Sequence, residues 1–207
     1  MTLDEALAGS PIVAILRGVR PDEVLAIAEA LFAAGVRAVE VPLNSPEPFE
    51  SVRRLADAFG TRMACGAGTV LNAADVEQSA EAGARFIVAP NTDAVVIRRV
   101  VELGLDPAPG FATASEAFVA IGAGARHLKL FPAATYGPGH LRQLASVLPR
   151  EAVVWAVGGV GAGDLKAWWA AGARGFGIGS EIYKSGQSAD ETAAKAAALV
   201  DAARALS

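Results

Sequence analysis

Short apolar runs alternate with segments of helical periodicity along the whole chain. Residues 12–17 form the first run, which is apolar up to a closing arginine, as is typical of a strand buried on both faces. The pattern predicts eight strands, at residues 12–17, 38–43, 63–69, 86–90, 105–110, 127–131, 153–157 and 176–180. The fifth is weak, because Pro107 and Pro109 interrupt it. Helices are predicted from 24 to about 34, up to about 59, over about 73–82 and 92–103, from about 115, and over about 140–148, 163–171 and 189–206.

A recurring tetrapeptide supports this phasing. Ala-Gly-x-Arg, or its shorter form Gly-Ala-Arg, stands between a helix and the next strand at residues 34–37, 82–85, 124–126 and 171–174. Repetition of one unit indicates a quasi-repeated βα architecture. The sequence therefore predicts an α/β protein with a single-domain (β/α)8 TIM barrel over residues 1–207. An open doubly wound sheet is the alternative, but no Gly-rich nucleotide fingerprint follows the first strand.

Composition narrows the classes of partner. Hydrophobic residues make up 53% and charged residues 19%, with a net charge of −4 and no basic run, so we expect neither nucleic acid nor an anionic membrane as partner. With one cysteine and two histidines, we expect no internal disulfide and no metal site. The N-terminus lacks the pattern of a signal peptide, and no apolar run is long enough to span a bilayer. We expect a cytoplasmic protein.

Lys129 is the first candidate for chemistry. The other three lysines lie among polar or helical neighbours, whereas Lys129 lies within the apolar run 127–131. Alternation along the strand places Leu128 and Leu130 toward the helices and Lys129 toward the barrel interior. Burial disfavours the ammonium, and a neutral amine can attack a carbonyl to form a Schiff base. The alternative is a buried lysine that only pairs with a carboxylate.

Glu40 is its expected companion. Val39 and Val41 flank it, so the same parity turns its side chain inward. A carboxyl near the amine can move protons while the imine forms. A plain ion pair between Glu40 and Lys129 is the other interpretation, and the sequence leaves both open.

Glycines at the ends of the last two strands predict an anion site. Exposed backbone N–H groups at Gly158, Gly159, Gly179 and Ser180 would bind phosphate at the usual place in a barrel. Arg17 ends the neighbouring first strand and could reach the same anion, or could belong to a surface pair.

Three further residue types have simpler alternatives. Thr69 could hydrogen-bond a substrate carboxylate, with Gly68 allowing close approach, or could cap the following helix. We interpret His127, His140 and Cys65 as structural, with His127 deeper than Lys129 on the same face.

With these residues placed, the chain resembles the bacterial class I aldolases of 2-keto-3-deoxy-phosphosugar acids over nearly its whole length. The matching stretches are AILRG at 14–18, VEVPLNSP at 39–46, GAGTV at 66–70, PN at 90–91, PG at 109–110, LKLFP at 128–132 and AVGGV at 156–160. The resemblance implies that Lys129 forms a Schiff base with pyruvate and that Glu40 is the general acid/base. It also implies a (β/α)8 barrel, a homotrimer and no metal or organic cofactor.

Two positions bear on the substrate. Where the branch acting on the 6-phosphogluconate derivative has an arginine and a threonine, this chain has Asn44 and Val157, as in the 6-phosphogalactonate branch. Phe111 stands where a smaller residue is common, and its ring could narrow the site. The expected reaction is cleavage of 2-dehydro-3-deoxy-6-phosphogalactonate to pyruvate and glyceraldehyde 3-phosphate. The alternatives are the gluconate epimer, another phosphate-binding barrel enzyme, such as an epimerase or synthase, and a non-enzymatic phosphosugar-binding barrel.

Overall fold

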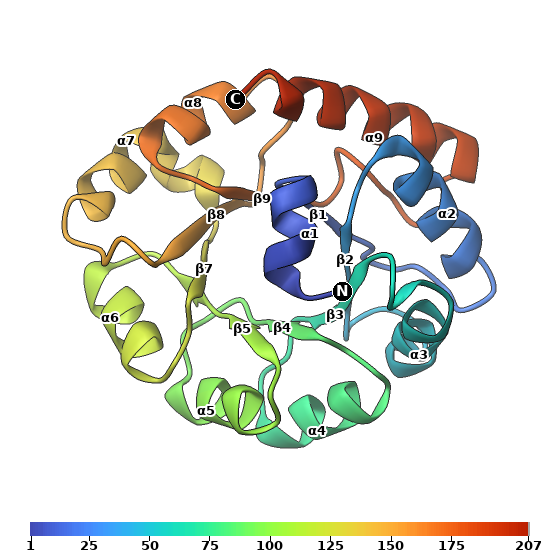
Figure 1. Cartoon of the computed structure of the whole chain (residues 1–207), viewed down its shortest axis with the longest axis horizontal. Helices are drawn as coiled ribbons and strands as arrows, with labels where there is room; N and C mark the ends of the chain where they lie inside the picture. The colour runs from blue at the N-terminus through green and yellow to red at the C-terminus, as the bar shows by residue number, and fades with distance from the viewer. Residues whose placement is uncertain (207) are drawn as a thin grey trace.

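Parallel strands form a nearly closed ring in the computed structural model, which describes residues 1–206 (Figure 1). Their order around the ring is β5-β4-β3-β2-β1-β9-β8-β7-β6. The strands are β1 (Ile12–Ile15), β2 (Ala38–Pro42), β3 (Ala64–Gly68), β4 (Phe86–Val88), β5 (Asp106–Ala108), β6 (Gly110–Phe111), β7 (His127–Leu130), β8 (Val153–Val157) and β9 (Gly175–Ile178). The predicted (β/α)8 barrel is confirmed.

Helices form an outer layer around the strands (Figure 1). They are α1 (Leu3–Gly9), α2 (Val24–Ala34), α3 (Pro48–Phe59), α4 (Ala73–Glu81), α5 (Ala94–Glu102), α6 (Ala114–Gly122), α7 (Ala133–Ala145), α8 (Leu165–Ala171) and α9 (Ala189–Arg204). Of the helices in residues 1–206, only α1, treated below, lies outside this layer. The predicted helix after Pro138 starts earlier, because a helical turn precedes a kink at Gly137, whose φ of 76° is not helical. Among residues 1–206, no helix is both long and apolar enough to cross a membrane.

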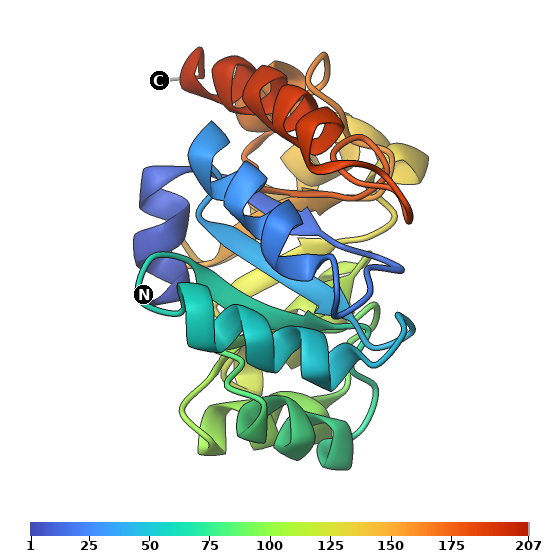
Figure 2. The ribbon, with the colours of Figure 1, turned by 90° about the vertical axis from the view of Figure 1, so that its right-hand side faces the viewer.

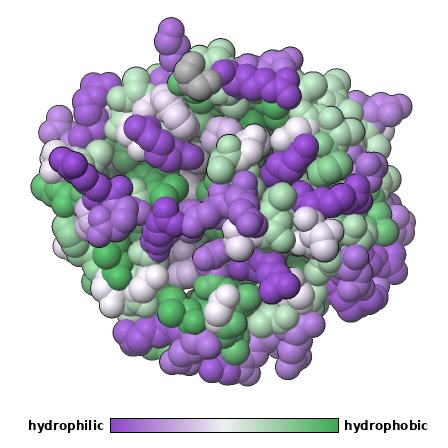
Figure 3. All heavy atoms as spheres, in the orientation of Figure 1, coloured by the Kyte–Doolittle hydropathy of each residue, from purple (hydrophilic) through white to green (hydrophobic). Residues whose placement is uncertain are grey.

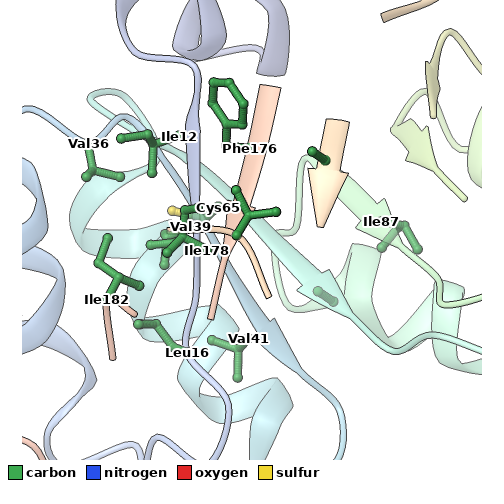
Figure 4. Close-up of a cluster of buried hydrophobic side chains, with 14 of the residues drawn as sticks. Ile12, Leu16, Val36, Val39, Val41, Cys65, Ile87, Phe176, Ile178 and Ile182 are labelled. Carbon is green, nitrogen blue, oxygen red and sulfur yellow. The ribbon is translucent and has the colours of Figure 1, made fainter. Parts of the chain in front are cut away.

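Side-chain alternation gives the barrel two apolar layers. Every second strand residue packs outward against the helices, as Val39, Cys65 and Ile178 do in Figure 4. The intervening residues fill the interior, where the edge of Trp155 meets the ring of Phe86 with centroids 6.3 Å apart. This strict parity decides which polar side chains point into the barrel.

The weak fifth strand is divided into β5 and β6 by Pro109. A proline cannot donate to a ladder, so pairing changes sides at this residue. Ala89 donates to the Ala108 carbonyl on one side, and Lys129 donates to the Pro109 carbonyl at 2.8 Å on the other. The division thus closes the ring and fixes the backbone of β7 at its lysine.

Helix α1 was not predicted, and it covers the N-terminal end of the barrel (Figures 1 and 2). Thr2 and Glu5 form a capping box that starts it, and Leu3 and Ala6 insert into the barrel interior. Asp4 pairs with Arg126 and lies 3.2 Å from His127 Nε2. Hydrophilic side chains cover much of this end of the molecule (Figure 3). Because sites of such barrels lie at the C-terminal ends of the strands, we expect the functional opening at the opposite end.

Candidate active site

A cavity of about 560 Å3 opens at the C-terminal ends of the strands. It brings together eight of the nine side chains or backbone positions predicted from the sequence. These are Arg17, Thr69, Lys129, Val157, Gly158, Gly159, Gly179 and Ser180. The ninth, Glu40, lies buried and does not line the cavity itself.

Lys129 points into the barrel, as alternation predicted. Leu128 and Leu130 pack outward, whereas Lys129 is only 6% exposed and lines the cavity. Its Nζ lies 4.9 Å from the centroid of the Phe131 ring. Burial lowers the pKa of Lys129 below its usual 10.5, against the opposing attraction of Glu40. An amine in this setting loses its proton readily and can act as a nucleophile.

Glu40 lies on the same inner face, at β2, and is 3% exposed. Burial raises the pKa of Glu40 above 4.5, and the positive charges of Lys129 and Arg17 oppose that rise. Its Oε2 has no hydrogen-bond partner, and within residues 1–206 no salt bridge joins it to Lys129. The two groups still attract each other electrostatically, and a buried carboxyl that no salt bridge holds can also gain and release a proton.

Gly68 leaves the space that Glu40 occupies. A Cβ built on Gly68 would lie 1.8 Å from Glu40 Oε2 and 2.7 Å from its Cδ. The sequence suggested that Gly68 admits a substrate carboxylate, but its open side receives the protein's own carboxyl group. Gly68 is thus a site residue whose partner depends on the register of β2 and β3, in which Pro42 lies opposite Gly68.

Thr69 directly follows β3 and lines the cavity in a strained conformation. Its φ is 59°, a region that a β-branched residue rarely enters. The alternative role as a helix cap is wrong, because Asn72 caps α4 by accepting from the Asp75 N–H. Strain of this kind occurs where a side chain must face a ligand.

The Arg17 guanidinium also lines the cavity, and it is tethered. Arg17 Nη1 donates to Asn44 Oδ1 at 2.7 Å. In the sequence, Asn44 marks a difference between the two branches of the family that the chain resembles. The structure thus joins one predicted cavity residue to one predicted specificity position.

Backbone groups dominate the far end of the cavity. Gly158 and Gly159 have φ values of 95° and 71°, and Gly159 leaves no room for a Cβ, which would meet Ala134 at 2.6 Å. After β9, Ile182 and Tyr183 donate to the Gly179 carbonyl and form one helical turn. The N–H groups that begin such a turn favour an anion.

The sequence-based prediction missed several residues that line the cavity. They are Ile15, Pro90, Phe131, Val160, Gly177, Glu181, Tyr183, Lys184 and Ser185. Lys184 looked like an ordinary surface lysine, and only its position after a barrel strand, between β9 and α9, could have indicated otherwise.

The residues interpreted as structural are not among those that line the cavity. The His127 ring lies at the α1 end, 5.4 Å from the Trp155 ring, and burial lowers its pKa. Burial raises the pKa of the Cys65 thiol to about 12. His140 Nε2 lies 2.6 Å from the Ala112 carbonyl oxygen. Phe111 packs in the outer layer, so its ring does not narrow the site.

Comparisons with known proteins agree with this geometry. Residues 3–199 match the sequence profile of the aldolase family described as KDPG and KHG aldolase. The 2-dehydro-3-deoxy-6-phosphogalactonate aldolase of Escherichia coli strain K12 is 48% identical over 194 residues, which cover 94% of this chain and 95% of that protein. The probable 2-dehydro-3-deoxy-6-phosphogalactonate aldolase of Rhizobium meliloti strain 1021 is 41% identical, over 93% of this chain and 91% of its own.

Solved structures give the same result. A structure described as native KDPGal superposes with a TM-score of 0.93 at 47% identity, over 95% of each chain. A cube-shaped protein cage designed by fusing symmetric oligomeric domains contains a chain that matches with the same score and identity, over 95% of this chain and 73% of that one.

Proposed function

The chain belongs to the KDPG and KHG aldolase family, and on that premise we propose that it cleaves 2-dehydro-3-deoxy-6-phosphogalactonate to pyruvate and glyceraldehyde 3-phosphate. One observation carries the proposal most directly. A buried amine, Lys129, lines one end of the cavity, the buried Glu40 carboxyl lies behind that lining, and glycine-rich backbone lines the other end. A phosphorylated keto acid has a ketone and a phosphate to match these two ends.

The chemistry follows from Lys129 and Glu40. Lys129 Nζ attacks the C2 ketone, and loss of water from the carbinolamine gives a protonated imine. Glu40 carries the protons of these steps and takes the proton of the C4 hydroxyl. The C3–C4 bond then breaks, its electrons move into the iminium, and the aldehyde leaves behind an enamine. Protonation at C3 and hydrolysis release pyruvate and restore the amine.

Binding is divided along the cavity. We assign the substrate carboxylate to Thr69 and the backbone beside it. The phosphate is assigned to the N–H groups around Gly158, Gly159, Gly179 and Ser180, with Arg17 and Lys184 as the cations of the cavity wall.

Trapping the imine tests the catalytic assignment. The protein is incubated with pyruvate and reduced with borohydride, and the adduct is mapped by mass spectrometry. The expected adduct is on Lys129, and Lys166 on α8 is the internal control. A protein that cleaves the substrate without an adduct at Lys129 would sink the Schiff-base mechanism.

Epimer preference is a separate proposal, which rests on Asn44 and on Val157, a cavity residue 3% exposed. We expect kcat/KM to favour the galactonate derivative over the gluconate derivative. Val157→Thr should narrow the difference, because it adds a hydroxyl next to the anion site. Equal preference in both proteins would remove Val157 from the argument.

We also propose that the chain forms a homotrimer in the cytoplasm. Apolar side chains are exposed on α6, where Phe118 and Val119 are 48% and 49% exposed, and a burying partner would cover them. The similar chain in a cage built from symmetric oligomeric domains supports an oligomer. Sedimentation equilibrium tests the number of subunits, and a monomer mass would overturn it.

A further inference from the structure

The segment Arg17–Gly18 is fixed by neighbours on both sides. Arg17 Nη1 donates to Asn44 Oδ1, and the Gly18 N–H donates to Ser45 Oγ at 2.9 Å. From the other side, Ser185 Oγ donates to the Gly18 carbonyl at 3.1 Å. The loops after β2 and β9 thus clamp the end of β1.

Gly18 suits this arrangement by its conformation. Its φ is 81°, and a Cβ there would lie 3.1 Å from the Ser185 Cβ. The loop after β9 also bonds to the start of α2, because the Tyr183 hydroxyl donates to Glu23 Oε1 at 3.0 Å. The backbone next to Arg17 is thus held in place, and Asn44 accepts a hydrogen bond from its guanidinium.

The tethered charge acts on the reaction centre. Burial lowers the pKa of Lys129, and the charge of Arg17 adds to that shift; burial raises the pKa of Glu40, and the charge of Arg17 opposes that rise. The contribution of Arg17 thus favours a neutral amine and an ionised carboxyl. The charged and titratable groups around the amine are Arg17 after β1, Glu40 on β2 and, after β9, Glu181, Tyr183 and Lys184. Arg17 is the cation among these whose effect reaches both Lys129 and Glu40.

We propose that Asn44 is a positioning residue that holds the Arg17 guanidinium in the cavity wall, where its charge acts on Lys129 and Glu40, on a backbone clamped by Ser45 and Ser185. The inference rests on the proposed function for its consequence in turnover. The physical link from Asn44 through Arg17 to Lys129 is independent of any substrate.

Four proteins test the link: wild type, Asn44→Leu, Arg17→Met and the double variant. The readout is the pH dependence of Lys129 acetylation by acetic anhydride, followed by mass spectrometry. Loss of Arg17 should move the midpoint to higher pH, because a nearby positive charge no longer opposes protonation. Asn44→Leu should do the same, and at neutral pH slow Lys129 labelling roughly threefold or more, since tenfold corresponds to one pKa unit.

The double variant decides between positioning and a separate role. If Asn44 acts through Arg17, the double variant labels no more slowly than Arg17→Met. Additive effects, or an unshifted midpoint in Asn44→Leu, would overturn the proposal. Gln143→Leu, which removes an exposed amide on α7, is the matched control and should leave the profile unchanged.

Turnover adds a second readout and separates the two proposals. In an active wild type, Asn44→Leu should lower kcat more than it raises KM and should shift the acidic limb of the kcat profile upward. A wild type without aldolase activity would contradict the proposed function, while the labelling experiment would still test Asn44.

Discussion

The buried position of Glu40 costs folding free energy. Its carboxyl is almost fully buried, and Oε2 has no hydrogen-bond partner. Such a group destabilises the folded state by about 1–3 kcal/mol, and an ionised one by more. Sites that need a proton carrier often accept this cost, because the same burial raises the pKa toward the working range.

Glu40→Gln should therefore be more stable and less active. We expect kcat to fall by roughly 10²–10⁴-fold, the usual contribution of a general acid/base. The pKa of Glu40 is higher in the folded than in the unfolded state. The folded state is therefore not penalised by this group below pH 4.5, and it loses stability as pH rises through the folded-state pKa. The Tm advantage of Glu40→Gln should thus appear with rising pH and vanish near pH 4. Calorimetry across this range checks it.

Gly68→Ala should displace the Glu40 carboxyl group while leaving its chemical identity unchanged. The added methyl group would occupy the position of Glu40 Oε2, so the side chain must move. A misplacement of about 1 Å can cost roughly 100-fold in rate, and we expect kcat/KM to fall by that order. Gly122→Ala is the control, because its Cβ meets nothing within 4 Å. Unchanged kcat/KM in Gly68→Ala would contradict the packing of Glu40.

Alternation along single strands was enough to turn Lys129 and Glu40 inward from the sequence. The contact between Glu40 and Gly68 was not predictable in that way, because it joins neighbouring strands and needs their register. The role of Arg17 was only half predicted, since its partner Asn44 comes from another loop.

Among the elements, the repeated Ala-Gly-x-Arg has a direct structural explanation. In its copies after α2 and α8, Gly35 and Gly172 adopt φ values of 105° and 112° and end the helix. In these two copies the arginine donates back across the turn, as Arg174 does to the carbonyl of Trp169 in α8 and to that of Ala173 beyond its end. There the motif ends the helix, turns the chain and satisfies carbonyls on both sides of the turn.

Gly172→Ala should lower stability without affecting catalysis. The left-handed conformation costs a non-glycine residue about 1–2 kcal/mol, while the added Cβ would meet Ala145 at an ordinary 3.4 Å. We expect Tm to fall by roughly 2–4 °C per kcal/mol, with kcat unchanged. Gly163→Ala, at an open position, should leave Tm nearly unchanged. An equal loss in both would show that the conformation of Gly172 is not the cause.

Across the whole molecule, the barrel was predictable and its closed end was not. Eight repeated units indicated a ring, and the ring placed the strand ends together. Helix α1 has seven residues, and its two buried apolar residues, Leu3 and Ala6, are too few to predict a helix that covers the end of the barrel. The cavity segment after β9 was missed in part because its polar residues resemble any surface loop.

Leu3→Ala tests how much the packing of α1 against the barrel interior stabilises the fold. The side chain is fully buried against the barrel interior, and deletion of such a group costs about 2–5 kcal/mol. We expect Tm to fall accordingly, with kcat/KM at 25 °C preserved, because the cavity lies at the other end. Leu25→Ala, at a side chain that is 39% exposed, should cost far less. A loss of activity greater than the loss of folded protein would contradict a purely structural role for α1.

Side chains fill the barrel interior and α1 covers its N-terminal end, so we expect both products to leave through the cavity at the C-terminal ends of the strands. In the proposed mechanism, pyruvate is still bonded to Lys129 when the aldehyde is already free. The aldehyde therefore departs first, and in the reverse direction pyruvate must arrive first. Product inhibition would record this sequence: pyruvate should compete with the cleavage substrate, and glyceraldehyde 3-phosphate should not.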